Sequence, residues 1–531
     1  MKTFLISGLG PARIENEDLL GSFFDDYNID VKTKFSIDGR SISPLDLVYT
    51  SNNGESVPVL RLKSKEKKET YISELLKGIL YESDEEFEFI DISLAWKNVE
   101  LNPKEKEAVV LLSTTFMWNT KMINMAVDWV YANFDSPVLV LGGQYSTLKL
   151  EYIVNNLFDK VDYIISGAAE LSLVDLIKTI DHRNSKNYHE IPNLWYKENG
   201  RFVFTFNKEF NYKDSKIVKF KGERKTMPYM SMRGCPYSCK FCALRECTPC
   251  WQFLSAERIL QDWDEYAKEN NSKHFTIRDS TFFIPYTKIE KLLPQLKGRN
   301  YIWTANSRVD TPFNQEVVRQ LEDAGCITLF FGFESMCDET LLKMDKRTTS
   351  SLNRKINSLF GESSILTAMS FIVGFPGETP SDFEYTHDYL VNEHIGRFTL
   401  YVFEYEGDIL PIAKEKEKYQ IEVYDDDEKY NWAHGGQNWK HIGMDSNKAK
   451  LLRRKTIKDS RANISSNSVF SSWQGKYQWP FVQGLSKMEN IKIEKLIDRL
   501  IFLFVDFPAD YKREAADILK ALSYYDIHIK E

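Results

Sequence analysis

The sequence predicts an α/β protein in three parts, and three observations support this prediction. Two separate stretches, residues 1–182 and 227–411, alternate short apolar runs with amphipathic segments, as parallel sheets covered by helices do. After residue 411 the pattern changes, and residues 412–531 contain mainly segments with helical periodicity. The chain of 531 residues is also long enough for three domains of ordinary size.

Residues 1–182 are expected to form a doubly wound domain with a Rossmann-like sheet. Apolar runs typical of buried strands occupy residues 3–7, 87–92, 108–113, 138–141 and 162–165. Gly142 and Gly143 follow the fourth run and Gly167 follows the fifth, so we expect these glycines at the carboxyl ends of strands. Ligands of open α/β sheets bind at that edge.

Residues 183–226 are predicted to be a polar, then basic, linker. Six lysines and arginines lie between residues 213 and 225, interleaved with aromatic side chains, and Asn199-Gly200 predicts a hairpin turn. This composition favours a solvated linker over a binding patch.

Residues 227–411 are predicted to form a partial (β/α)6 barrel. Helical patterns separate six strand-like runs, at residues 229–232, 274–277, 301–305, 327–331, 367–373 and 398–403. Gly325 after one helix and Thr379 before another are the expected cap residues. In such barrels the chemistry takes place at the carboxyl ends of the strands.

The composition excludes several classes of partner. The net charge of −8 argues against a nucleic-acid polymer, because neutralising phosphates requires an excess of lysine and arginine. No apolar run approaches the roughly 18 residues of a membrane span, and the first residues lack the apolar core of a signal peptide. We therefore expect a cytoplasmic protein that binds neither membrane nor nucleic acid.

The seven cysteines are unevenly placed. The first 234 residues contain none, and five lie within residues 235–250, which suits a metal or cluster site in a reducing compartment better than a disulfide framework. Cys235, Cys239 and Cys242 have C-x3-C-x2-C spacing. Three thiolates on one loop can hold three irons of a [4Fe–4S] cluster and leave the fourth iron open, whereas structural zinc prefers two separated pairs.

The cysteine segment resembles the signature of the radical S-adenosylmethionine (SAM) superfamily, with Phe241 at the aromatic position before the third cysteine. The resemblance runs from about residue 226 to 411. It continues at the ends of the second to fifth strands, in residues 278–282 (RDSTF), 303–310 (WTANSRVD), 332–335 (GFES) and 374–379 (GFPGET).

This resemblance implies that SAM binds the open iron and is cleaved reductively to a 5′-deoxyadenosyl radical, which removes a hydrogen atom from the substrate. It also implies site residues by position. Asp279 and Arg308 would hold the methionine moiety, Glu334 the ribose hydroxyls and Phe241 the adenine. The alternative for each charged residue is a salt bridge at the barrel rim.

Residues 138–147 and 161–170 are similar to the cobalamin-binding domain of B12-dependent radical SAM enzymes. The resemblance implies that Gly142, Gly143 and Gly167 contact cobalamin. Two features depart from the family. Its usual G-E-G-E reads Gly-Ala-Ala-Glu at residues 167–170, and the D-x-H-x-x-G segment that supplies a lower-face histidine in other cobalamin proteins is absent. A scaffold without the cofactor is therefore the alternative.

Cys247 and Cys250 form a further C-x2-C pair. They are either ligands of an auxiliary cluster or zinc, or small buried residues, and the lack of a second such pair favours burial. Methylthiotransferase activity is not expected, because those relatives use amino-terminal cysteines.

The expected function is cobalamin-dependent methylation of an unactivated carbon in a natural product or peptide, with a reductant such as flavodoxin or ferredoxin. The alternatives are a radical rearrangement, cyclisation or epimerisation without methyl transfer, and a non-catalytic cobalamin or cluster sensor.

Overall fold

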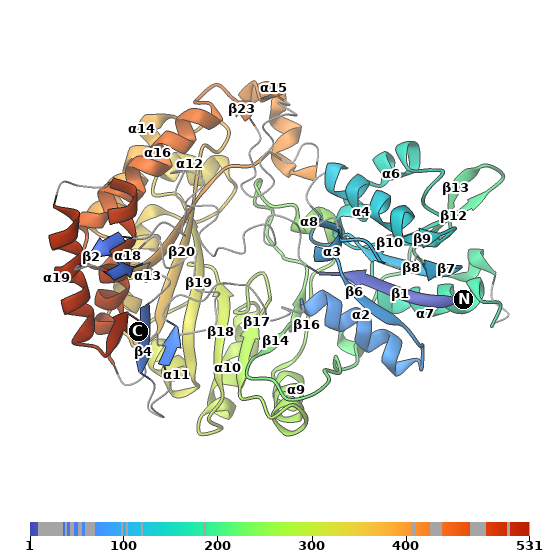
Figure 1. The fold of residues 1–531 in the computed structure, drawn as a ribbon, viewed down its shortest axis with the longest axis horizontal. Coiled ribbons are helices and arrows are strands. Elements are labelled where there is room, and N and C mark those ends of the chain that lie inside the picture. The colour runs from blue at the N-terminus through green and yellow to red at the C-terminus, as the bar shows by residue number, and fades with distance from the viewer. Residues whose placement is uncertain are drawn as a thin grey trace.

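The structure is a computed structural model of the 531-residue chain. It describes residues 1–8, 35–37, 40–42, 47–50, 56–58, 70–96, 99–101, 105–117, 120–183, 187–405, 409–424, 438–467, 485–506 and 510–529. Two seven-stranded sheets dominate it, one in each half of the view in Figure 1.

The amino-terminal sheet has five parallel strands in the order β6-β1-β8-β10-β11. Their bounds are Glu88–Asp91, Lys2–Ser7, Ala108–Ser113, Val138–Gly142 and Tyr163–Ile165. Counted along the chain this order is 2-1-3-4-5, one of the two common doubly wound topologies. The predicted fold class of this region is therefore confirmed.

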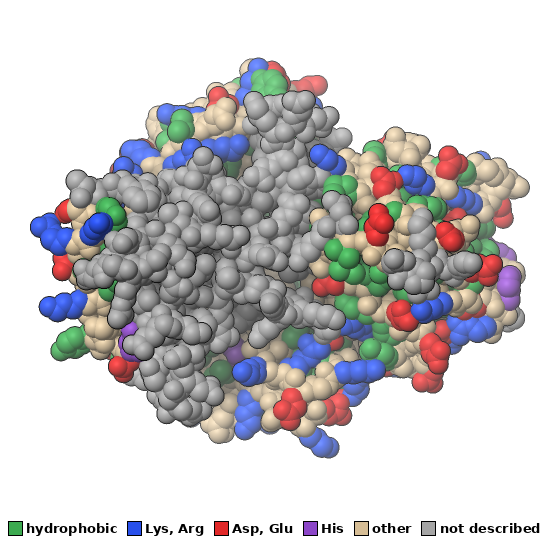
Figure 2. All heavy atoms as spheres, in the orientation of Figure 1, with side chains coloured by type: hydrophobic (Ala, Val, Ile, Leu, Met, Phe, Trp, Pro, Cys, Tyr) green, Lys and Arg blue, Asp and Glu red, His purple; other side chains and the backbone are tan. Residues whose placement is uncertain are grey.

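Alternation along the strands buries both faces of this sheet. Phe4 and Ile6 of β1 pack with helix α4 (Thr120–Asn133) on one face, whereas Leu5 packs with α2 (Tyr71–Glu82) and α7 (Leu173–Ile180) on the other. Successive side chains of a strand point to opposite faces, so a continuous apolar run produces two apolar faces. Acidic and basic side chains are interspersed over the visible surface of this domain, on the right of Figure 2.

Part of the expected linker belongs to the first sheet. Strands β12 (Leu194–Glu198) and β13 (Arg201–Phe204) form an antiparallel hairpin that extends the sheet beyond β11. Asn199 and Gly200 make the turn with φ of +51° and +73°, as the sequence predicted. Composition did not reveal the pairing, because a polar hairpin on a sheet edge resembles a linker.

The second sheet is the predicted barrel. Its strands pair in parallel in chain order, β14-β17-β18-β19-β20-β21, and the short β24 (Ser466–Asn467) follows. The six strands are Met227–Tyr229, His274–Ile277, Ile302–Ser307, Cys326–Glu334, Leu366–Val373 and Gly396–Val402.

Helices connect successive barrel strands: α9 (Ala256–Glu269), α10 (Tyr286–Leu296), α11 (Gln315–Asp323), α12 (Asp338–Lys343), α13 (Ser350–Gly361) and α14 (Pro380–Asn392). Thr379 caps α14 in a capping box with Asp382, and Gly325 follows α11 with φ of +81°, so both predicted caps are confirmed. This topology places all six strand ends at one mouth.

The carboxyl-terminal region is largely helical and lies beside the last barrel strands, at the left and the top of Figure 1. It contains α15 (Lys416–Tyr419), α16 (Ser446–Asp459), α18 (Lys487–Asp506) and α19 (Tyr511–Ser523), with the hairpin β22 (Glu422–Tyr424) and β23 (Asn438–Lys440). None of the helices in the described part of the chain is both long and apolar enough to cross a membrane.

A segment of the expected amino-terminal domain lies elsewhere. Strands β4 (Leu47–Thr50) and β5 (Ser56–Pro58) form a small antiparallel sheet with β25 (Ile527–Ile529), beside α18 and α19. The hairpin of β2 (Phe35–Ile37) and β3 (Arg40–Ile42) lies at the same end of the molecule. The described residues of this segment therefore pack with the carboxyl-terminal region rather than with the first sheet.

Candidate functional site

The cysteine loop lies at the mouth of the barrel. It follows β15 (Met232–Arg233) and leads into α8 (Leu244–Cys247). Cys235, Cys239 and Cys242 are partly buried free thiols, and the Cys242 amide donates to the Cys239 carbonyl at 3.1 Å. Burial raises the pKa of Cys239, and the nearby Lys346 and Arg308 cations act in the opposite direction. Positive charge beside the loop favours the thiolates that metal ligation requires.

Contacts from later elements hold this loop in place. The Lys240 amide donates to Met344 O at 2.9 Å, and the Ser238 hydroxyl donates to Asp345 Oδ2 at 2.6 Å. The Ile412 amide donates to Lys240 O at 3.1 Å. The cysteine positions thus depend on the segment after α12 and on the start of the carboxyl-terminal region.

Arg308, just after β18, lies directly against the loop. Its guanidinium makes two bonds to Asp310, at 2.9 and 3.0 Å, and donates to Lys346 O at 2.6 Å. It also lies 3.8 Å from Cys239 Sγ and 3.6 Å from the centre of the Tyr237 ring. Arg308 therefore has the expected rim salt bridge and also contacts the cysteine loop.

Glu334 ends β19 with φ of +61° and is buried. The Lys346 ammonium donates to Glu334 Oε1 at 2.8 Å and lies 5.6 Å from the centre of the Phe241 ring. The structure thus brings Cys239, Arg308, Glu334 and Phe241 together around Lys346. Sequence reasoning missed Lys346, because one lysine after a short helix has no distinctive spacing.

Asp279 is buried beneath the loop and only 1% exposed. It accepts hydrogen bonds from the Ser231 amide at 2.7 Å and the Met232 amide at 3.0 Å. Burial raises its pKa, and Lys288 opposes the rise. In this arrangement Asp279 positions the strand that leads to the cysteines. The contact of Asp279 with the methionine moiety of SAM stays a prediction. The hydrogen bonds that Asp279 already makes to Ser231 and Met232 do not favour it.

The glycines of the first domain lie where the sequence placed them, at the carboxyl edge of its sheet. Gly142 ends β10, Gly143 follows with φ of +110°, and Gly167 follows β11 with φ of +122°. A Cβ atom on Gly143 would lie 2.8 Å from Thr115 N, so this turn requires glycine.

A cavity of about 170 Å³ joins this edge to the barrel. The first domain supplies one wall and the segment after the cysteine loop another; the lining residues are Thr115, Met117, Gln144, Tyr145, Leu148, Ala243, Leu244, Cys247 and Ile409. Cys247 thus faces the cavity, whereas the Cys250 thiol donates to Glu209 Oε1 at 3.1 Å.

Glu170, the acidic residue of the altered Gly-Ala-Ala-Glu motif, forms an ion pair with Arg233. The Arg233 guanidinium lies 4.9 Å from the ring centres of both Phe210 and Tyr212. The motif is therefore tied to the residue that precedes the cysteine loop.

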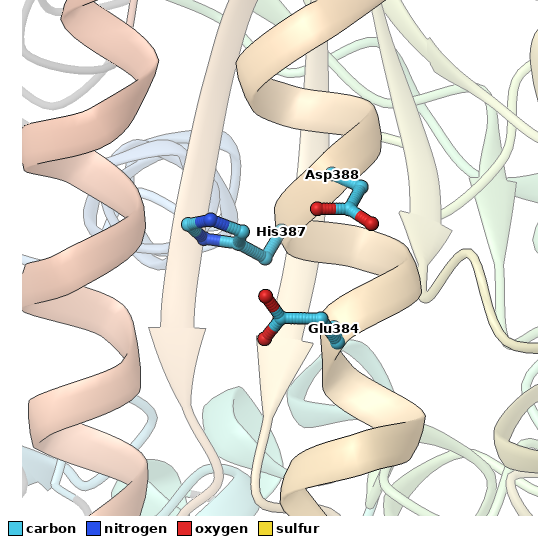
Figure 3. Close-up of side chains that lie close together, drawn as sticks. All are labelled: Glu384, His387 and Asp388. Carbon is cyan, nitrogen blue, oxygen red and sulfur yellow. The ribbon is translucent and has the colours of Figure 1, made fainter.

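Glu384, His387 and Asp388 of α14 form another group with possible metal ligands (Figure 3). His387 Nδ1 is 2.9 Å from Thr456 Oγ1, and its Nε2 is 3.3 Å from the Lys455 ammonium. Both ring nitrogens are engaged and a cation is already close, so these three residues do not fit a metal site.

The barrel matches a known family. Residues 229–390 match the family model described as the radical SAM superfamily, the family that the cysteine segment resembles. A segment of 264 residues is 26% identical to an uncharacterized methyltransferase of Pyrococcus horikoshii, covering 47% of this chain and 56% of that protein. A segment of 267 residues is 24% identical to the anaerobic magnesium-protoporphyrin IX monomethyl ester cyclase of Cereibacter sphaeroides, covering 47% and 43%. The aligned regions span about half the length of these relatives.

The whole fold resembles two solved structures. One is the radical SAM methyltransferase TsrM from Kitasatospora setae, solved with cobalamin and a [4Fe–4S] cluster; the TM-score is 0.57 at 15% identity, covering 80% of this chain and 95% of that one. The other is the cobalamin-dependent radical enzyme OxsB, solved with aqua-cobalamin and SAM; the TM-score is 0.56 at 16% identity, covering 86% and 81%. These similarities confirm the predicted combination of folds.

Proposed function

We propose that the chain is a radical SAM enzyme that methylates an unactivated carbon with the help of cobalamin. The observation that carries the proposal is the placement of three free thiols on one loop of a radical SAM domain, directly beside Arg308, Lys346 and Glu334.

The cysteine loop fits a [4Fe–4S] cluster, because three thiolates leave one iron open for the amino and carboxylate groups of SAM. A cluster held there supplies the electron that cleaves the bound SAM. Arg308 and Lys346 add positive charge on the same side, where a carboxylate would be bound, and Glu334 can accept hydrogen bonds from ribose hydroxyls once Lys346 turns toward SAM. Phe241 offers an apolar face beside them.

The cavity between the domains, lined mainly by apolar side chains together with Thr115 and Gln144, would hold part of a corrinoid. It lies beyond the carboxyl ends of the strands, where doubly wound domains bind ligands. None of its described lining residues is a histidine, which agrees with binding without a protein ligand to cobalt. Cobalamin held there supplies a carrier for the methyl group. The similarity in fold to two cobalamin-binding proteins supports this assignment.

An anaerobic assay tests the proposal. Reconstituted protein receives reductant, SAM and candidate substrates, with and without methylcobalamin. Formation of both 5′-deoxyadenosine and S-adenosylhomocysteine supports methylation. If neither product forms and Cys239→Ala behaves like the wild type, the enzymatic proposal is wrong. A natural product or peptide stays the predicted substrate class, and flavodoxin or ferredoxin the predicted reductant.

A radical rearrangement, cyclisation or epimerisation without methyl transfer is the second candidate. Two observations favour it. Glu170, the acidic residue of the altered motif in the cobalamin-binding-like domain, is already paired with Arg233. In addition, one relative is named a cyclase. Deoxyadenosine without S-adenosylhomocysteine, from protein that shows no corrinoid absorbance, would support this candidate instead.

A further inference from the structure

The loop that follows β20 is held by residues far away in the sequence. This mouth loop, residues 374–378, lies at the same edge of the barrel as Glu334, because β19 and β20 are parallel neighbours. Gly374 and Gly377 both have φ of +87°. A Cβ atom on Gly374 would overlap the Trp439 indole, and one on Gly377 would overlap the Tyr419 ring. The carboxyl-terminal region thus packs directly on this loop.

His441 binds both ends of the mouth loop. Its Nδ1 accepts hydrogen bonds from the Gly377 amide at 3.3 Å and the Gly443 amide at 3.0 Å. With Nδ1 acting as the acceptor, the proton is on Nε2, which donates to Gly374 O at 3.2 Å. The imidazole also stacks on Trp439, with ring centres 5.1 Å apart and planes at 10°. One flat ring therefore supplies an acceptor, a donor and a packing face.

The same region reaches the cysteine loop. We call residues 409–424 and 438–444 the collar. Its Ile412 amide donates to Lys240 O, and Glu415 forms an ion pair with the Lys240 ammonium. Between the two loops, Lys343 donates to Gly377 O at 2.7 Å, and Met344 O accepts from the Lys240 amide. Collar, mouth loop and cysteine loop therefore form one connected set of contacts.

We propose that the collar positions the mouth loop for SAM binding and that His441 is its central positioning residue. The inference rests on the proposed function, since it assigns part of the SAM site to the carboxyl-terminal region. The contacts of His441 are with backbone groups of the mouth loop and of Gly443 and with the Trp439 ring, so it is a positioning residue. His441 fixes the distance between Gly374 and Gly377. Lys343, which donates to Gly377 O, then fixes the position of the mouth loop relative to the cysteine loop.

The chemistry of His441 makes the proposal testable by substitution. Phenylalanine keeps a flat ring against Trp439 but has neither acceptor nor donor. Glutamine lacks the ring but has an amide oxygen and an amide N–H. Burial lowers the pKa of His441 to about 4. The hydrogen bond to Gly374 O and the charge of Asp445 oppose this shift and Lys343 adds to it, so the ring stays neutral throughout a test at pH 7–8.

The test compares His441→Phe, His441→Gln and His387→Phe in the full-length, cluster-reconstituted protein. His387 is a matched control, because it is also a buried histidine between the barrel and the carboxyl-terminal region, bonded to Thr456 of α16. SAM affinity is measured by equilibrium dialysis, iron content by chelation and stability by thermal unfolding. Hydrogen exchange of the Gly377 and Gly443 amides is measured in protein without SAM.

We expect His441→Phe to weaken SAM binding about tenfold, as the loss of two or so net hydrogen bonds implies, with iron content unchanged and both amides exchanging faster. His441→Gln should bind SAM within about threefold of the wild type. His387→Phe should lose thermal stability without losing SAM affinity.

Unchanged SAM affinity in His441→Phe would overturn the inference, and so would an equal loss in His387→Phe, which would indicate general destabilisation. If the wild-type chain itself fails to bind SAM, the proposed function is wrong. In that case the exchange rates still decide whether His441 holds the mouth loop: unchanged rates overturn that role, and faster rates support it.

Discussion

The barrel mouth and the edge of the amino-terminal sheet both lie at the carboxyl ends of parallel strands, yet they are lined by different kinds of side chain. At the mouth, charged side chains are buried and paired around the cysteine loop, as in the contacts of Lys346 with Glu334 and of Arg308 with Asp310. At the sheet edge, uncharged and mainly apolar side chains line a small cavity, and the turn at Gly143 beside it leaves no room for a Cβ atom. Removing a charged side chain at the mouth should therefore lower the affinity for SAM. Adding atoms at the sheet edge should instead leave no room for a corrinoid.

The sharpest test of the mouth is removal of a cluster thiol. Cys239→Ala should lower the iron content of reconstituted protein and reduce SAM cleavage by more than about 1000-fold, because the remaining thiols cannot hold the cluster in its open-iron form. Iron analysis and product chromatography measure both effects. Cys250→Ala is the control, since Cys250 bonds to Glu209, and it should keep the iron. Equal iron loss in both variants would instead make Cys250 a ligand.

The edge is tested by adding one carbon atom. Gly143→Ala places a Cβ atom against Thr115 and forces a residue with a side chain to adopt φ of +110°. We expect loss of corrinoid binding, followed by absorbance, and a stability loss of about 2–4 kcal/mol.

Gly200→Ala is the matched control for this change. Gly200 also has positive φ, but a Cβ atom there meets nothing within 4 Å. The cost should be about 1 kcal/mol with corrinoid binding intact. If Gly143→Ala still bound cobalamin as the wild type does, the edge would not be the cofactor site.

A substitution with an effect of intermediate size tests whether Lys346 contributes to SAM binding. Lys346→Met removes a cation and leaves the buried Glu334 carboxylate unpaired. SAM affinity should fall about tenfold or more, because the Lys346 ammonium would no longer bind the carboxylate of SAM and a hydrogen bond to a charged group contributes about 1.5–3 kcal/mol. Equilibrium dialysis measures the change. Lys297→Met removes an exposed lysine that pairs with Asp323 and should leave SAM affinity unaltered. An unchanged affinity in Lys346→Met would remove this residue from the site.

A pH-dependent effect on stability is expected from Glu378, at the end of the mouth loop. It is fully buried and accepts from the Gly374 amide at 2.6 Å, and burial raises its pKa to about 8. The folded chain therefore holds a proton that the unfolded chain releases near pH 4.5. Stability falls as pH rises from about 4.5 to 8, by up to about 5 kcal/mol.

Glu378→Gln removes this titration while keeping an amide oxygen for Gly374. Its unfolding temperature should exceed that of the wild type by a margin that grows between pH 5 and pH 8. A margin independent of pH would show that Glu378 is already charged at neutral pH.

The two regions also differ in how well the sequence predicted them. The cysteine spacing, the six strands and the glycines at strand ends were readable, because ligand spacing and apolar periodicity are local properties of the chain. The contacts of Asp279 with Ser231 and Met232 were not, since the fate of a strand-end carboxylate depends on the neighbouring strand. Lys346 was missed for the same reason, because its contacts with Glu334 and Arg308 depend on how the strand ends come together.

The sequence by itself determined that this chain has two parallel α/β sheets and a three-cysteine loop suited to a site-differentiated cluster. Both follow from patterns within short stretches of chain. The tertiary structure alone decided that residues 194–204 complete the first sheet, that β4 pairs with β25 at the other end of the chain, and that the collar contacts two loops of the mouth. Such contacts join residues tens to hundreds of positions apart, and their energy comes from burial and hydrogen bonding that only the folded chain provides.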